Sequence, residues 1–204
     1  MTRVVADISV SLDGYVTGPN PGPDNGLGDG GEALHRWAFS DDPDEQEVLR
    51  SATTASGAVV LGRTLFDIVD GPGGWNDETG YGAGEVGTPP FVVVTSSPPD
   101  GVRLSDLRWT FVTTGLPDAI ETARRLAAEE SSGRGTDLDV VLMGGRRLVG
   151  TALDAGLVDV LSLHLAPVVL GGGTPLFVEG AGRELRRTDV RTTSNATHLM
   201  FDAL

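Results

Sequence analysis

The segment Gly144-Gly145-Arg146-Arg147 carries the clearest chemical signal in this chain of 204 residues. A short apolar run, 140–143, precedes the two glycines, and a helical pattern that ends at Gly156 follows them. Glycine lets a backbone approach a ligand closely, and a helix N-terminus presents unpaired N–H groups to an anion. The segment therefore predicts a phosphate-binding turn. The alternative is a tight strand-to-helix turn with exposed arginines.

Two other turns follow strand-like runs in the same way. Gly62-Arg63-Thr64 comes after the run 58–61, and Thr95-Ser96-Ser97 ends the run 91–95. Ligands of open parallel sheets bind beyond the carboxyl ends of the strands, so the three turns are expected to meet in one crevice. A guanidinium suits phosphate, although Arg63 could instead make surface contacts at a helix start. Ser96 and Ser97 stand before two prolines, which is also ordinary turn chemistry, and Arg147 is expected in solvent.

A carboxylate in the first strand is the candidate proton donor. Residues 4–12 alternate apolar and polar, which places Asp7 and Ser9 together on the polar face. Reduction of a C=O or C=N bond needs a proton from a group within hydrogen-bond reach. Asp7 is the first candidate, and Glu32 and His35 are weaker ones. The alternative for Asp7 is a structural carboxylate paired with a helix-end N–H.

Composition excludes several kinds of site. All 15 basic residues are arginine and cysteine is absent, which removes lysine and thiol chemistry, disulfides and cysteine-type zinc sites. The three histidines are too far apart for a local metal motif, so no metal is expected, and His164 is expected to be a hydrogen-bonded structural residue. A net charge of −14 disfavours nucleic acid and anionic lipid as partners. Without a membrane-length apolar run or a signal-peptide core, the chain is expected to be soluble and cytoplasmic.

The elements that would position these residues alternate between strands and helices. Helices are expected at 32–39, from Pro43 to about Ser56, and from Pro117, and strands at 4–12, 58–61, 91–95, 109–113, 140–143, 158–166, 184–191 and 195–203. This order predicts one α/β domain over residues 1–204, with a largely parallel central sheet flanked by helices and an antiparallel C-terminal hairpin.

Two irregular segments interrupt this pattern. Residues 18–31 are rich in Gly, Pro and Asn and predict a long loop, either a functional lid or a disordered segment. Residues 70–90 are also irregular and contain a literal dinucleotide fingerprint from Gly82 to Gly87. That match is rejected, because no strand precedes it and no helix follows it.

Three motifs resemble the dihydrofolate-reductase-like family that includes the reductase domain of bacterial riboflavin biosynthesis. They are Ser11-Leu12-Asp13-Gly14-Tyr15-Val16, the turn Gly62-Arg63-Thr64, and the block from Leu157-Val158-Asp159 to Gly171-Gly172-Gly173-Thr174-Pro175-Leu176-Phe177. The resemblance covers nearly the whole chain. It implies a dihydrofolate-reductase-like fold, NADPH as cofactor and a homodimer.

Site residues follow from the resemblance by position. It implies that the adenosine 2′-phosphate is surrounded by Arg63, Ser96, Ser97 and Arg146, beside Gly62 and Thr95. It implies that the pyrophosphate contacts Thr64 and a cis Gly144-Gly145 peptide. The resemblance implies that the nicotinamide lies near Val16. It also points the polar face with Asp7 at the substrate and matches Trp37 and Phe39 to an aromatic pair.

The function expected is an NADPH-dependent reductase that transfers a hydride to a C=O or C=N bond of a small, pteridine- or pyrimidine-like heterocycle. One position departs from the resemblance, because Leu34 stands where dihydrofolate reductases carry a pterin-binding carboxylate. Folate reduction is therefore not expected. The alternative is a non-catalytic NADP-binding or ligand-sensing protein of the same fold.

Overall fold

A computed structural model describes residues 2–22, 24–76, 80–81, 88–178 and 182–203. The strands are β1 (Val4–Ser11), β2 (Tyr15–Thr17), β3 (Ser56–Gly62), β4 (Phe91–Val94), β5 (Trp109–Val112), β6 (Asp139–Met143), β7 (Val160–Ala166), β8 (Thr174–Pro175), β9 (Leu185–Thr192) and β10 (Thr197–Ala203). The helices are the 3-10 helix η1 (Gly31–Phe39) and the α-helices α1 (Pro43–Thr54), α2 (Arg63–Val69), α3 (Leu116–Arg134) and α4 (Arg146–Asp154).

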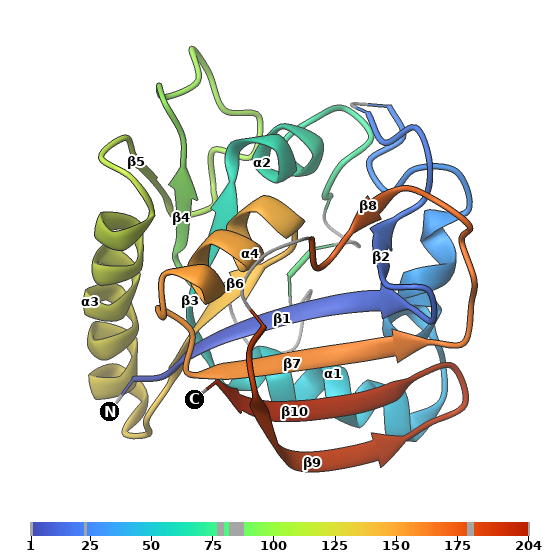
Figure 1. Cartoon of the computed structure of the whole chain (residues 1–204). Coiled ribbons are helices and arrows are strands. Elements are labelled where there is room, and N and C mark those ends of the chain that lie inside the picture. The colour runs from blue at the N-terminus through green and yellow to red at the C-terminus, as the bar shows by residue number, and fades with distance from the viewer. Residues whose placement is uncertain (1, 23, 77–79, 82–87, 179–181, 204) are drawn as a thin grey trace.

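One large sheet organises these elements (Figure 1). Its strand order is β5-β4-β3-β6-β1-β7-β10-β9, and a separate small sheet joins β2 to β8. The strands from β5 to β7 pair in parallel, whereas β10 pairs antiparallel with both β7 and β9. The predicted α/β class, parallel centre and antiparallel C-terminal hairpin are confirmed.

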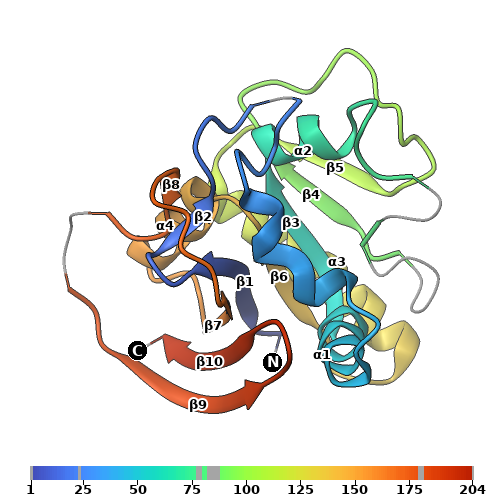
Figure 2. The ribbon, with the colours of Figure 1, turned by 90° about the vertical axis from the view of Figure 1, so that its right-hand side faces the viewer.

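Alternating side chains of the strands build two cores. In β3, Ala58 and Val60 join a core with α3 and α4, whereas Val59 and Leu61 join a second core with Phe66 of α2. This alternation is that of strands buried on both faces. Figure 1 shows α4 in front of the sheet and α1 behind it, and Figure 2 gives the view along the other direction.

The face opposite α3 and α4 carries the polar side of β1. Val4, Ala6, Ile8 and Val10 enter the first core, so Asp7 and Ser9 project to the other face. The 3-10 helix η1 covers them there, since the indole Nε1 of Trp37 donates to Ser9 Oγ at 3.0 Å. The helix η1 therefore covers the polar face of β1 that the sequence predicts.

Several predicted boundaries differ from the structure. The helix that begins at Pro43 ends at Thr54, because the β3 strand already begins at Ser56. The predicted 32–39 helix is present, as the 3-10 helix Gly31–Phe39. The predicted long loop, 18–31, is stabilised by internal hydrogen bonds, since the side chains of Asn20 and Asn25 both donate to the Asp29 carboxylate. The Gly82 to Gly87 match lies outside the described residues.

Candidate functional site

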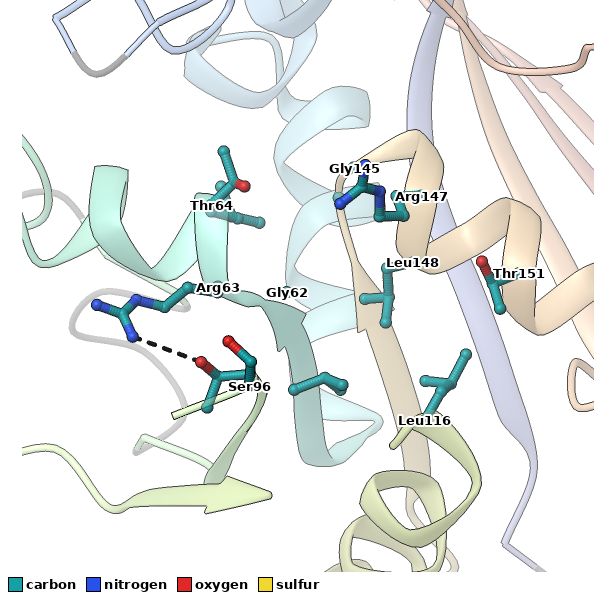
Figure 3. A pocket seen from close by; sticks show the side chains of 13 residues that line it. Gly62, Arg63, Thr64, Ser96, Leu116, Gly145, Arg147, Leu148 and Thr151 are labelled. Atoms are coloured by element: carbon teal, nitrogen blue, oxygen red, sulfur yellow. Dashed lines mark hydrogen bonds between the residues drawn. The ribbon is translucent and has the colours of Figure 1, made fainter. Parts of the chain in front are cut away.

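The three predicted turns meet in one pocket of about 460 Å³ (Figure 3). It lies at the carboxyl ends of β3, β4 and β6, where the parallel strands deliver their following residues to one edge of the sheet. The lining residues are Gly62, Arg63, Thr64, Leu65, Val94, Thr95, Ser96, Leu116, Gly144, Gly145, Arg147, Leu148 and Thr151. The sequence therefore places the turns correctly relative to one another.

Arg63 is held in place by two neighbouring segments. Its Nε donates to Asp67 Oδ1 at 2.7 Å, and its Nη1 donates to the carbonyl oxygen of Ser97 at 2.9 Å and to Thr95 Oγ1 at 3.4 Å. The side chain keeps 37% of its surface exposed. The guanidinium is thus oriented at the pocket mouth with surface left for an anion. Ser97 contributes a carbonyl oxygen and is not among the lining residues.

The glycine pair forms the turn from β6 into α4 with a different backbone conformation from the one expected. Gly144 has φ +71° and Gly145 has φ +62°, and the peptide between them is trans, so the predicted cis bond is wrong. Two left-handed residues turn the chain without the cost of a non-proline cis bond. A Cβ on Gly144 would also come within 2.7 Å of Leu65 Cδ2. Residues with side chains do not fit this turn easily.

The two arginines after the glycines exchange the expected positions. Arg147 lines the pocket and is exposed, whereas the half-buried Arg146 is not among the lining residues. One residue along an α-helix is a rotation of about 100°, so the start of α4 decides which arginine faces the pocket. The sequence gives no cap by which to place that start, since Gly145 provides no side-chain hydrogen bond.

Further lining residues are missing from the sequence-based site. Leu148 and Thr151 line the pocket from α4 together with Arg147, and Thr151 is four residues after Arg147 and three after Leu148, as for neighbours on a helix face. Leu116 begins α3 and lines the pocket below Leu148 and Thr151 in the view of Figure 3. The four-residue spacing from Arg147 is the signal that finds Thr151, and the three-residue spacing from Thr151 back along α4 then finds Leu148. Leu116 has no such signal, because it comes from another helix.

Asp7 lies one strand away from this pocket. It pairs in register with Met143 of β6, the residue before Gly144, and is not itself among the lining residues. Its Oδ1 atom is 2.8 Å from Nε2 of His164, and a quarter of its side chain is exposed. The partner of Asp7 is therefore an imidazole and not the helix-end N–H considered as the alternative. His164 is the hydrogen-bonded histidine that the sequence predicts.

The two aromatic candidates, Trp37 and Phe39, have different surroundings in the structure. Trp37 is buried and stacks on His164, with 4.1 Å between ring centroids. Phe39 is 75% exposed and Val16 is part of the first core, so neither is gathered with Trp37 and Asp7. Leu34, at the position of the missing carboxylate, is fully buried.

His35 is the other titratable group of η1. Its Nδ1 atom is buried and has no hydrogen-bond partner within the part of the chain that the structure describes. Burial, with a smaller contribution from His164, lowers the pKa of His35 to about 4. His35 is thus neutral near pH 7 and does not supply a proton there.

A protein-family model and a curated protein match this chain. The family model of the RibD C-terminal domain matches residues 2–199. The uncharacterized protein YyaP of Bacillus subtilis (strain 168) is 43% identical over 58 residues, which are 28% of this chain and 31% of that protein. The match thus spans about a third of the length of that curated relative.

Solved structures share the fold at low sequence identity. A Shewanella sp. PV-4 protein assigned to riboflavin biosynthesis superposes with a TM-score of 0.68 at 19% identity, over 100% of this chain and 99% of the other. The Thermotoga maritima diaminohydroxyphosphoribosylaminopyrimidine deaminase/5-amino-6-(5-phosphoribosylamino)uracil reductase gives 0.61 at 14%, over 100% and 57%. Enterococcus faecalis dihydrofolate reductase, complexed with NADP(H), gives 0.56 at 12%, over 98% and 96%.

These superpositions show a dihydrofolate-reductase-like fold. The family model extends over nearly all of the chain, from the first strand into β10. The protein therefore belongs to the RibD C-terminal domain family.

Proposed function

We propose that this protein is an NADPH-dependent reductase that transfers a hydride to a C=O or C=N bond of a small, pyrimidine- or pteridine-like heterocycle. The observation that carries the proposal is the convergence of Arg63, Arg147 and the Gly144-Gly145 turn in one pocket. Membership of the RibD C-terminal domain family supports a reductase-like role. The Thermotoga protein is described as a uracil-type reductase, and the Enterococcus enzyme as a complex with NADP(H).

The residues present fit a dinucleotide with three phosphates. Two guanidiniums offer planar donor forks, and the uncapped N-terminus of α4 offers backbone N–H groups next to the glycines. Gly144 has φ +71°, a backbone conformation that favours glycine, and glycine allows a chain to approach a phosphate closely. In this arrangement Arg63 and Ser96 would hold the 2′-phosphate, and Thr64, Gly145 and Arg147 the pyrophosphate.

The cofactor would supply the hydride, and the chain must supply position and a proton. The carboxyl end of β6 lies beside the middle of β1, since Met143 and Asp7 are register partners. A substrate beside a nucleotide bound at the Gly144 turn would therefore face the η1-covered side of β1. Asp7 is a partly exposed carboxyl group on that side, at the hydrogen-bond distance from His164 given above.

A second candidate function is a non-catalytic NADP-binding or ligand-sensing protein. The observation that favours it is Leu34, a fully buried apolar residue where the resemblance would place a substrate-binding carboxylate. Turnover separates the two functions, because both require nucleotide binding.

The experiment combines binding and turnover. NADPH is titrated by its fluorescence, and its oxidation is followed by nicotinamide absorbance with a panel of oxo- and amino-substituted pyrimidines and pteridines. The reductase proposal expects saturable NADPH binding and oxidation that depends on one member of the panel. Binding without oxidation across the panel would favour the second function, and absence of NADPH binding would contradict both.

A further inference from the structure

A chain of hydrogen bonds crosses the η1-covered face of the sheet, from α1 to β1. Glu45 Oε1 is 2.9 Å from Thr193 Oγ1, which is 3.1 Å from His198 Nε2. His198 Nδ1 is 2.7 Å from His164 Nδ1, and His164 Nε2 is 2.8 Å from Asp7 Oδ1. These five residues are called the Glu45–Asp7 chain below. The two histidines meet because they are directly opposite in the antiparallel pair of β7 and β10.

The two ends of the Glu45–Asp7 chain differ in exposure. Glu45 is fully buried and the two histidines are buried at 3% and 6% exposure, whereas a quarter of the Asp7 side chain is exposed. Trp37 covers the middle, stacked on His164 and edge-on to His198. A proton can therefore leave the Glu45–Asp7 chain most readily at Asp7.

The direction of the hydrogen bonds is set at the Glu45 end. Glu45 accepts from the backbone N–H of Asn195 at 2.6 Å and from its side-chain amide at 2.9 Å. Burial raises the pKa of Glu45, but hydrogen bonds from Asn195, Ser40 and Thr193 outweigh burial and leave the pKa lowered. Glu45 is thus a carboxylate that accepts from the Thr193 hydroxyl. The carbonyl oxygen of Ala196, at 3.1 Å, is the other acceptor for that hydrogen.

This direction fixes the hydrogen positions on both imidazoles. The Thr193 oxygen, having given its hydrogen to an acceptor oxygen, accepts from Nε2–H of His198. Burial and the neighbouring His164 lower the pKa of His198 to about 4, so His198 is neutral and carries one ring hydrogen. Nδ1 of His198 then accepts, and Nδ1 of His164 must donate to it.

The last contact needs a hydrogen that the preceding groups do not provide. If His164 were neutral with its hydrogen on Nδ1, Nε2 would present a lone pair to a carboxylate oxygen 2.8 Å away. Two acceptors at that separation in a partly buried place repel each other, because the contact distance is that of a hydrogen bond with no hydrogen between them. One additional proton between Nε2 and Oδ1 removes the conflict.

We propose that Asp7 and His164 together hold one dissociable proton, which Asp7 gives to the oxygen or nitrogen atom of the substrate double bond. This inference rests on the reductase function proposed above. A bound reduced nicotinamide would supply the hydride for the new C–H bond and would itself be oxidised. The π electron pair of the reduced double bond would move to the heteroatom, which would take the proton from Asp7. The Asp7–His164 pair loses one proton in this step and takes up another from water at the partly exposed Asp7.

Other titratable and charged groups face this pair from several elements. His35 comes from η1, Tyr81 from the segment between α2 and β4, and His198 from β10 with Arg191 and Glu45 behind it. Burial raises the pKa of Tyr81 and lowers that of His35, so both are uncharged near pH 7. Thr193, His198 and Glu45 act through His164 and are positioning residues.

The decisive measurement is the tautomer of His198. Long-range ¹H–¹⁵N NMR spectra of protein labelled in its three histidines report which ring nitrogens carry hydrogen, and His35→Gln assigns the signal outside the Glu45–Asp7 chain. The proposal expects His198 to be protonated on Nε2 and His164 on Nδ1, with the extra proton shared between His164 Nε2 and Asp7. A hydrogen on Nδ1 of His198 would reverse the direction, remove the need for the extra proton and overturn the proposal.

Two variants extend this measurement. Asp7→Asn replaces the acceptor by an amide that can donate to His164 Nε2, so His164 should become a neutral imidazole with its hydrogen on Nδ1. In a turnover assay Asp7→Asn should lower kcat about 100-fold or more, with NADPH affinity unchanged, as for loss of a general acid. Wild-type kcat in Asp7→Asn would overturn the role of Asp7 as donor.

Thr193→Val tests the positioning role, and Thr188→Val is its matched control. Thr188 is an exposed residue of the same hairpin, whose hydroxyl bonds the carbonyl oxygen of Met200. Thr193→Val should move the pH profile of kcat and let His198 carry its hydrogen on Nδ1, whereas Thr188→Val should change neither. An unchanged profile in Thr193→Val would contradict the positioning role. The NMR measurement needs neither nucleotide nor substrate, so a failure of the reductase function is seen separately from a failure of the proton assignment.

Discussion

Arg63 serves the fold and the pocket with the same guanidinium. Its contacts to Asp67 and to the 95–97 turn join α2 to the end of β4, and the exposed part of the side chain faces the pocket. In a chain of net charge −14, an anionic ligand depends on such local positive groups. The affinity for a phosphate at this place should therefore respond strongly to one arginine.

Arg63→Ala should weaken NADPH binding at least tenfold and affect NADH much less. A charge-assisted hydrogen bond contributes roughly 1.5–3 kcal/mol, and about 1.4 kcal/mol corresponds to a factor of ten. The measurement is fluorescence titration of both nucleotides at one ionic strength. Arg125→Ala is the matched control, since Arg125 pairs with Glu129 on the exposed side of α3, away from the pocket. Equal wild-type affinities for NADPH and NADH would contradict the assignment.

The neutral histidines make stability depend on pH. Folding lowers the pKa of His35 and of His198 from 6.5 to about 4, so the unfolded chain binds more protons than the folded one between these values. Their contribution to stability is full above pH 6.5 and is lost as the pH falls toward 4, by up to ~3 kcal/mol for each histidine.

We expect the free energy of unfolding, from denaturant melts, to fall as the pH is lowered from 6.5 to 4.5. This interval lies above the pH range in which Asp42 and Glu45, whose pKa values are lowered, contribute to the pH dependence. His35→Gln should flatten this dependence by the share of His35. A free energy of unfolding that is constant over this interval would show that the two histidines are not held neutral by the fold.

At the scale of elements, the start of α4 decides the geometry of the pocket. Gly145→Val would place a β-branched side chain at φ +62°, a strained conformation, although no atom of the chain lies within 4 Å of its Cβ. In the proposed arrangement, the side chain would fill the space that the pyrophosphate of NADPH needs. We expect NADPH binding to be abolished while the cooperative unfolding transition remains.

The matched control for this variant is Gly150→Ala, inside the same helix. A Cβ at Gly150 also meets nothing within 4 Å, and alanine in a helix interior is favoured over glycine by ~0.5–1 kcal/mol. Gly150→Ala should therefore keep NADPH affinity and unfold at a slightly higher denaturant concentration. Wild-type affinity in Gly145→Val would remove this turn from the nucleotide site.

The sequence predicts the elements better than their side-chain contacts. Apolar runs such as 58–61 and 140–143 identify buried strands because both faces of the sheet are covered, and three of the pocket turns follow from them. Arg147 is misplaced because a single residue of shift at a helix start rotates the face. The contact between His164 and His198 depends on the register of two strands separated by 34 residues, and local patterns do not fix that register.

At the scale of the whole molecule, four of the exposed large apolar residues lie on segments that meet around β2 and β8. Leu12, Val169, Phe177 and Val178 are between 55% and 68% exposed. Two backbone hydrogen bonds bring their segments together, from Leu12 N to the carbonyl oxygen of Val168 and from Leu176 N to that of Gly14. By contrast, Leu161 of the apolar strand β7 is buried in the first core. The exposed set is therefore the better candidate for a subunit interface.

We predict that the protein is a homodimer that buries these four residues, because exposed large apolar side chains that lie together commonly mark interaction sites. Sedimentation at micromolar concentration should give about twice the 21.2 kDa of one chain. Phe177→Glu should shift the species toward the monomer, since a carboxylate would be desolvated in the interface. Val190→Glu is the control, because Val190 is also exposed but lies on the edge strand β9. A wild-type species of 21.2 kDa would reject the dimer, and a dimer that survives Phe177→Glu but not Val190→Glu would move the interface to the edge of the sheet.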